Sequence, residues 1–202
     1  MVPSGNKRED ILNATFELVQ NFGLNELTTA KIARASGTAE TIIYRHFSNK
    51  HAIMTELLQR TCLDFQKAAA FVVAEPISPF EKIEKLTALH LEFIQRTHGM
   101  SRILFSEQVH LAAASDPLKQ IARTLAIESR HCVKQIIEEG IRCSLYNKNL
   151  DIETASMSFM GVFYLLIHEW SLDDFSWNIT DKKAQIVEHF HQSWACKNKP
   201  ID

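Results

Sequence analysis

The chain has 202 residues, of which 46% are hydrophobic and 23% are charged, as is ordinary for a soluble globular protein. A chain of this length buries enough surface to form a core without disulfide or metal staples. Its net charge of -2 at pH 7 excludes a generally basic protein, so any nucleic-acid binding has to depend on locally placed charge.

The four cysteines are scattered without a C-x-x-C spacing, which favours free thiols in a reducing cytosol. The N-terminus begins polar, and the longest apolar run, Met160 to Ile167, is far too short to cross a bilayer. We therefore expect a cytoplasmic protein without a signal peptide and without membrane association.

Helical periodicity dominates the chain, whereas strand signals are scarce. Segments with a 3.6-residue apolar period alternate with short breaks at Gly, Pro, Asn, Asp and Ser. The pattern predicts an all-α fold of about nine helices. The first ends at Gly23, expected as a left-handed C-cap. The others are expected from about residue 28, and over 39–47, 50–74, 79–97, 101–111, 116–143, 151–172 and 180–195.

Capping patterns fix several of these helix ends. Ser78, Pro79 and Glu81 form a predicted capping box with proline at the first helical position. Asp116-Pro117 repeats the cap-then-proline signal before a long helix. His98-Gly99 is expected to stop the helix that begins at Ser78.

The most informative stretch is residues 27–50, which reads as a short helix, a tight turn and a second short helix. Gly37 lies in the turn, where a positive φ costs it nothing. The residues expected to face inward are Leu27, Ile32, Ala33, Ile43 and Phe47. Those expected to face outward are Glu40, Thr41, Tyr44, Arg45 and His46. This arrangement predicts a helix-turn-helix, whose second helix lies in the major groove of DNA.

At these positions the sequence resembles the TetR family. The shared features are a threonine pair, an Ile-Ala step, a glycine in the turn, a Tyr-x-His-Phe run and a lysine opening the next helix. In this chain they are Thr28-Thr29, Ile32-Ala33, Gly37, Tyr44-Arg45-His46-Phe47 and Lys50. The motif resemblance covers roughly the first 55 residues, and beyond it only helix number and lengths agree.

The resemblance implies a set of DNA contacts. Thr28 and Thr29 would bind a phosphate at the start of the first motif helix. Tyr44 and His46 would contact the DNA backbone, and Lys50 would neutralise a phosphate. The candidates for reading bases are Glu40, Thr41 and Arg45, since arginine pairs bidentately with guanine and threonine contacts a thymine methyl.

Two features leave the base preference open. Glu40 repels phosphate but can accept a hydrogen bond from cytosine, and Ile42 supplies no hydrogen bond. Residues 1–50 hold six Lys or Arg and five acidic residues, a net charge of only +1, so a moderate salt dependence is expected. The alternative interpretation is that Tyr44 and His46 are ordinary helix-surface residues and Lys50 a solvated charge.

The last two long helices are expected to form a dimer interface, because the resembling family pairs such helices in a four-helix bundle. The helix from Asp151 to Leu172 is apolar on more than one face, and Gly161 would let another backbone approach. The assigned interface residues are Phe159, Val162, Leu166, Trp170, Val187, Phe190 and Trp194. Burial within one subunit is the alternative.

The resemblance also implies an effector cavity among the middle helices. Its assigned walls are Phe65, Phe93, Ile94, Leu104, Phe105, Gln108, Phe159 and Phe163, although each could equally be plain core. The abundance of phenylalanine suggests an apolar or aromatic effector. We expect no cofactor and no metal site, because the histidines show no zinc-binding spacing, and no enzyme activity, because no catalytic constellation is present.

The sequence thus predicts a transcriptional regulator of two domains. Residues 1–50 would form the three-helix, helix-turn-helix DNA-binding domain, and residues 51–202 the helical effector-binding and dimerisation domain. The expected partners are a double-stranded DNA operator, a second copy of the chain and an unknown small-molecule effector that releases a repressor from DNA. The alternative is a DNA-bound scaffold controlled by a protein partner.

Overall fold

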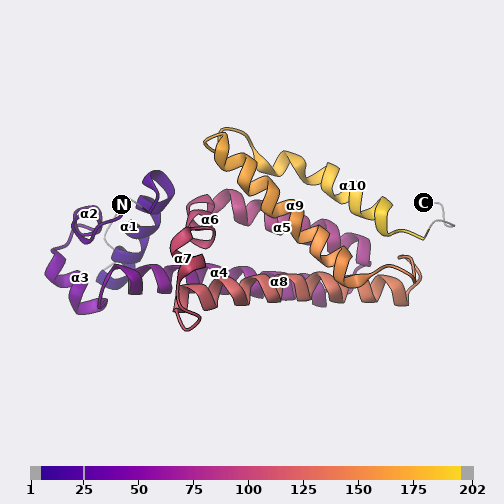
Figure 1. Ribbon diagram of the computed structural model, residues 1–202, viewed down its shortest axis with the longest axis horizontal. Coiled ribbons are helices and arrows are strands. Elements are labelled where there is room, and N and C mark those ends of the chain that lie inside the picture. Colours follow the sequence, from indigo (N-terminus) through magenta and orange to yellow (C-terminus); the bar gives the residue numbers. More distant parts are fainter. Residues whose placement is uncertain (1–5, 25, 197–202) are drawn as a thin grey trace. The chain divides into compact units, whose positions relative to one another are not determined.

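A computed structural model describes residues 6–24 and 26–196, except for the side chains of residues 102 and 108. Helices account for most of this part of the chain, and no strand occurs in it beyond a single bridge between Tyr146 and Ala195 (Figure 1). The predicted all-α fold is therefore confirmed. None of the helices in residues 6–24 and 26–196 is long and apolar enough to span a membrane.

The described helices number ten, together with one 3-10 helix. Their bounds are α1 Lys7–Phe22, α2 Thr29–Ala35, α3 Glu40–His46, α4 Lys50–Ala74, α5 Pro79–Arg96, α6 His98–Leu104, α7 Glu107–Leu111, α8 Pro117–Arg142, α9 Ile152–Leu172, η1 Ile179–Lys182 and α10 Lys183–Trp194. By their contacts they divide into two compact units. Unit 1 contains residues 1–63 and 97–123, and unit 2 contains residues 64–96 and 124–202.

Most of the predicted caps are present. The Ser78 hydroxyl accepts from the Glu81 amide at 3.3 Å, while the Glu81 carboxylate accepts from the Ser78 amide at 2.9 Å. This is the reciprocal capping box expected from the sequence. Asp116 accepts from the Leu118 amide at 2.9 Å and so caps α8. Gly23 follows α1 with φ of 74° but an extended ψ of -174°, so its φ is positive without the full left-handed cap geometry.

The segment after α5 differs from the prediction. A stop was expected at His98-Gly99, but α5 ends at Arg96 and both residues begin α6. Gly99 has another function, because its amide is bonded to the Gln20 side chain of α1 and a Cβ would collide with the backbone of Gln20. The single helix predicted over 101–111 is two, since Ser106 interrupts it and caps α7 by accepting from the Val109 amide.

Unit 1 packs the three N-terminal helices against one another, with α6 also lying on α1. Its apolar centre holds Ile11, Leu12, Ile32, Ile43 and Ile53, each at most 2% exposed. An amphipathic α1 supplies two of these side chains, and α2, α3 and α4 supply one each. The short α2 and α3 are therefore held by burial, since helices of seven residues are not stable alone.

Unit 2 is built around aromatic side chains of α9 and α10, which run side by side with α5 (Figure 1). The ring of Phe159 is fully buried and lies 5.0 Å from that of Phe190, which lies 4.9 Å from Trp194. Near the end of α9, the Trp170 indole donates to the carbonyl of Trp177, which follows the helix, at 2.7 Å. The C-terminal helices therefore form one continuous core with α5.

Gly140 in α8 is set against the Tyr146 ring, and a Cβ there would overlap the ring carbons. We expect Gly140→Ala to lower the free energy of unfolding by about 1–3 kcal/mol, the usual cost of overpacking. The measurement is urea unfolding followed by circular dichroism. A double-mutant cycle with Tyr146→Leu is the control, because the penalty of the alanine should shrink once the ring is gone. An equal penalty in both backgrounds would contradict the packing argument.

Candidate nucleic-acid interface

The residues predicted to form a helix-turn-helix do so within unit 1. α2 and α3 pack on each other and on α1. Leu27, Ile32, Ala33, Ile43 and Phe47 are all buried, as predicted from their spacing. The exposed surface of α3 is therefore polar at four positions and aromatic at one.

The turn between the two helices depends on Gly37. Its φ is +62°, in the left-handed region, while a Cβ there would meet nothing within 4 Å. Backbone conformation, not close packing, is thus what requires glycine. The Thr38 amide donates to the Ala33 carbonyl at 3.0 Å, and this bond closes the end of α2.

Glu40, Thr41, Tyr44, Arg45 and His46 are all exposed on α3. Tyr44 is 55% exposed, and its hydroxyl lies 3.5 Å from the hydroxyl of Thr29. Thr29 donates to the Glu40 carboxylate at 2.9 Å. The carboxylate of Glu40 is thus held against α2, where its interaction with Thr29 restrains it from reaching freely toward a base.

Thr28 and Lys50 both contribute to local structure. The Thr28 hydroxyl accepts from the Lys31 amide at 3.2 Å and caps α2. The Lys50 ammonium donates to the Leu27 carbonyl at 3.0 Å. Because an ammonium has three N–H donors, this bond fixes Lys50 beside the start of α2 and leaves donors for a phosphate.

Ion pairs show which charges of residues 1–50 are neutralised and which are not. Lys7 pairs with Asp10, Arg8 with Glu56 and Lys31 with Glu26. The Lys31 ammonium lowers the pKa of the Glu26 carboxyl through their hydrogen bond. In the described chain, Arg34, Arg45 and Lys50 form no ion pair. The uncompensated positive charge of this region therefore belongs to α2, α3 and the first residue of α4.

Two basic residues escaped the sequence-based selection. Arg34 is exposed on α2, but no motif position drew attention to it. Arg8 of α1 donates to the His46 carbonyl at 3.1 Å and holds its guanidinium 4.5 Å above the Phe47 ring. It also pairs with Glu56 of α4. Arg8 is a positioning residue for α3, and only the three-dimensional arrangement reveals it.

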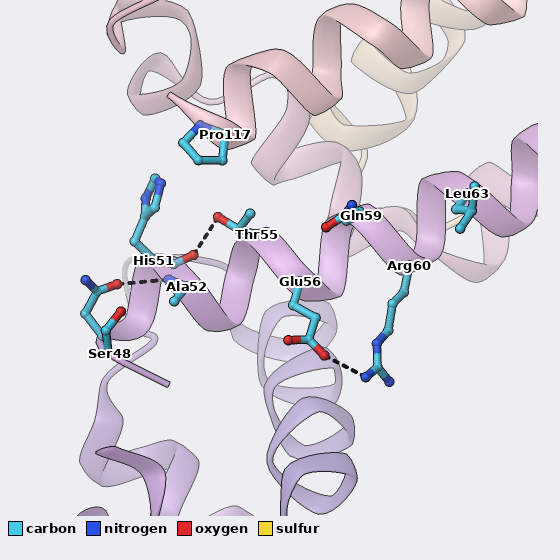
Figure 2. A pocket seen from close by; sticks show the side chains of 10 residues that line it. Ser48, His51, Ala52, Thr55, Glu56, Gln59, Arg60, Leu63 and Pro117 are labelled. Atoms are coloured by element: carbon cyan, nitrogen blue, oxygen red, sulfur yellow. Dashed lines mark hydrogen bonds and ion pairs between the residues drawn. The ribbon is translucent and has the colours of Figure 1, made fainter. Parts of the chain in front are cut away.

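An open depression also lies in unit 1, along α4 (Figure 2). Its lining is polar at most positions, and none of the predicted effector residues belongs to it. Glu56 and Arg60 pair at 2.6 Å on its wall, and His51 contacts Asp116 at 3.3 Å. Paired charges on an open surface do not suit an apolar molecule, so this depression is not the predicted effector cavity.

The predicted effector residues fall into two groups. Phe65, Phe93, Ile94, Phe159 and Phe163 are buried in unit 2. Leu104, Phe105 and Gln108 belong to unit 1, where Leu104 is half-buried and Phe105 is 43% exposed. The side chain of Gln108 lies outside the described part. Phe65, Phe159 and Phe163 of the first group contact His90, a residue that the sequence analysis did not select.

Most of the residues predicted for the dimer interface are buried within the single chain. Phe159, Leu166, Trp170, Phe190 and Trp194 are at most 9% exposed within a single chain, and Val162 and Val187 are half-buried. These five side chains belong to the core of unit 2. The exposed apolar residues of α9 are instead Met157, Tyr164, Leu165 and Leu172.

Comparisons with known proteins agree with this geometry. The family model described as bacterial regulatory proteins, tetR family, matches residues 11–57. The fatty acid metabolism regulator protein of Bacillus subtilis is 21% identical over 182 residues, 90% of this chain and 92% of that protein. The nucleoid occlusion factor SlmA of Vibrio vulnificus is 26% identical over 197 residues, 97% of this chain and 96% of that protein.

Among solved structures, the regulator FadR of Bacillus subtilis in complex with stearoyl-CoA superposes with a TM-score of 0.73 at 20% identity. The match covers 90% of this chain and 96% of that one, so the two share a fold. The matched segment 11–57 contains the whole helix-turn-helix and its supporting helix α1. Residues 11–57 therefore form an N-terminal domain that matches the tetR family of bacterial regulatory proteins, and the chain as a whole shares the fold of FadR.

Proposed function

We propose that the chain is a cytoplasmic, homodimeric transcriptional repressor that leaves its operator when a largely apolar or aromatic effector binds. In this proposal residues 1–50 bind DNA and residues 51–202 bind the effector and the second copy. The observation that carries it is the surface of α3, on which Tyr44 and Arg45 are exposed and Arg45 has no ion-pair partner among the described residues. The similar proteins bear the names of regulators and of an occlusion factor, not of enzymes.

The DNA contacts follow from that surface. Tyr44 and Lys50 contact phosphates, and these contacts fix the position of α3 on the DNA. Further phosphate contacts at the edge of this surface come from Thr28, Thr29 and His46. Arg45 and Thr41 read base edges. Two copies place their α3 helices in successive major grooves, roughly 34 Å apart.

The proposed dimer surface is the exposed apolar face of α9. Met157, Leu165 and Leu172 are between 56% and 70% exposed, and Tyr164 is 43% exposed. Gly161 lies between them along the helix, where a Cβ would meet nothing within 4 Å. A contiguous apolar face on a helix marks a protein contact, and a glycine there permits close approach of a second helix.

Effector binding has to discriminate between the operator-bound and released states, because a ligand that binds both equally shifts neither. α4 and α8 each contribute residues to both units, so they supply a continuous chain path from unit 2 to unit 1. We propose that the effector acts through them on the spacing of the two α3 helices. A change of a few Å would break most of the specific contacts.

The test is a gel-shift assay with DNA upstream of the protein's own gene, followed by addition of candidate effectors. Stearoyl-CoA is one probe, because the FadR structure of Bacillus subtilis contains it. We expect a retarded protein–DNA complex, and we expect at least one long-chain or aromatic compound to dissociate it. Failure to bind that DNA and any member of a random-sequence DNA pool would refute the proposal.

The second candidate is a DNA-bound scaffold that a protein partner controls. The similarity to a nucleoid occlusion factor over nearly the whole chain supports this second candidate. In that case DNA binding would persist with every small molecule, and a protein would associate with the chain only in the presence of its DNA site. The same gel-shift assay therefore separates the two candidates.

A further inference from the structure

His90 of α5 is buried inside a cluster of aromatic rings in unit 2. Its own ring is 5% exposed and stacks on Phe163, with centroids 4.6 Å apart and planes 22° apart. Phe65 and Phe159 meet it edge-on, with centroids at 4.8 Å and 6.0 Å. The ring of Phe93 belongs to the same cluster, since its centroid lies 4.6 Å from that of the Phe65 ring. A histidine is the only polar ring among these side chains.

The hydrogen bonding of His90 fixes which nitrogen carries the proton. Nδ1 lies 2.8 Å from the carbonyl oxygen of Leu86. A carbonyl only accepts, so Nδ1 is the protonated nitrogen and donates. Burial lowers the pKa of His90 to about 4, and the ring is therefore neutral near pH 7. Nε2 consequently has a lone pair and no hydrogen, which makes it an acceptor.

That acceptor has no hydrogen-bond partner among the described residues. The neighbouring buried polar groups of α5 behave differently, because Thr87 donates to the Ile83 carbonyl at 2.7 Å and Lys82 pairs with Glu139 at 2.7 Å. A buried acceptor left without a donor destabilises a fold, so proteins rarely keep one without use. The position of Nε2 among predicted effector residues suggests what that use is.

We propose that Nε2 of His90 is the hydrogen-bond acceptor for the effector's single donor group, a hydroxyl or an amide N–H on an otherwise apolar or aromatic molecule. The ligand reaches Nε2 by displacing one of the phenylalanine rings that cover it. The proposal rests on the proposed function, since it places the effector in unit 2. It excludes an ionised carboxylate at this atom, because two acceptors cannot share a bond without a hydrogen.

Two matched pairs of probes test the donor requirement on the full-length protein without DNA. 4-Butylphenol and 1-octanol carry a donor, whereas 4-butylanisole and 1-methoxyoctane have the same apolar bodies and none. We expect each hydroxyl compound to bind about three- to tenfold more tightly than its ether in isothermal titration calorimetry, as one neutral hydrogen bond provides. In His90→Phe this preference should disappear, while ether binding remains.

Nitrogen NMR of the histidine-labelled wild-type protein provides a second measurement that needs no variant. The free protein should show His90 protonated at Nδ1, and the hydroxyl probes alone should shift the Nε2 resonance. Phe93→Leu is the matched control, because it alters the apolar wall and should change the affinity for both members of a pair alike. His90→Gln, which keeps an acceptor, should retain part of the preference.

Several results would overturn the proposal. They are equal binding of hydroxyl and ether by the wild-type protein, an undiminished preference in His90→Phe, a proton on Nε2 in the free protein, and no binding of any of the four probes. None of these bears on DNA binding. A protein that binds the hydroxyl probes through His90 but fails the gel-shift assay would instead refute the repressor function and leave this site intact.

Discussion

The double variant Tyr44→Ala/Lys50→Ala is expected to bind DNA of any sequence about a thousandfold more weakly than the wild-type protein. Each side chain lies where it can contact a phosphate, and a dimer presents each of them twice. Four lost contacts at about 1 kcal/mol each amount to roughly three powers of ten in affinity. Lys50 is held beside the start of α2 by its bond to the Leu27 carbonyl, so its charge occupies a fixed position on this surface.

Fluorescence anisotropy with an operator fragment and with unrelated DNA, at several salt concentrations, measures this effect. The slope of log affinity against log salt should fall by about 1 for each lost lysine contact. Lys67→Ala is the control for net charge, since this lysine is exposed in unit 2 and its loss removes one positive charge, as the loss of Lys50 does. Arg45→Ala should behave differently and weaken operator binding more than binding to unrelated DNA. Unchanged affinity in the Tyr44/Lys50 variant would show that the DNA surface is misassigned.

Leu165→Glu is expected to convert the protein from dimer to monomer at micromolar concentration. Leu165 is 57% exposed on the apolar face of α9, so a charge there costs the folded single chain little. In a dimer across this face, two carboxylates would be buried without partners, and burying an unpaired charge is strongly unfavourable. Operator binding should fall in parallel, because one chain reaches only one half-site.

Light scattering coupled to size-exclusion chromatography gives the mass of the variant directly. Phe71→Glu is the matched control, since Phe71 is 69% exposed in unit 2 but lies on α4. It should leave the mass unchanged. A dimeric Leu165→Glu protein, with circular dichroism like that of the wild type, would rule out this face as the interface.

The helix-turn-helix could be predicted from the sequence in nearly all its parts. Its inward positions follow a strict period, its turn needs a positive φ at Gly37, and its caps depend on adjacent residues. Each of these signals is local, so the chain itself displays them. The capping box at Ser78 and the N-cap at Asp116 were predictable for the same reason.

The remaining site features depend on contacts between distant segments. Apolar residues of α9 all look alike in the sequence, and only packing against α5 and α10 separates the buried Phe159 from the exposed Leu165. His90 stands out only because rings from residues 65 and 163 meet it. Gly99 looked like a helix stop because its neighbour Gln20 is about eighty residues away in the chain.

Arg8 has a consequence for any attempt to transplant DNA specificity between proteins of this fold. The carbonyl of the last residue of α3, the ring that follows it and a carboxylate of α4 all contact this one guanidinium. The position of α3 thus depends on a side chain of the first helix, outside the helix-turn-helix itself. If α3 reads bases as proposed, a graft of residues 39–47 onto another scaffold would transfer the proposed base-reading side chains but not the contacts that position them, unless the residues at positions 8 and 56 were transferred as well.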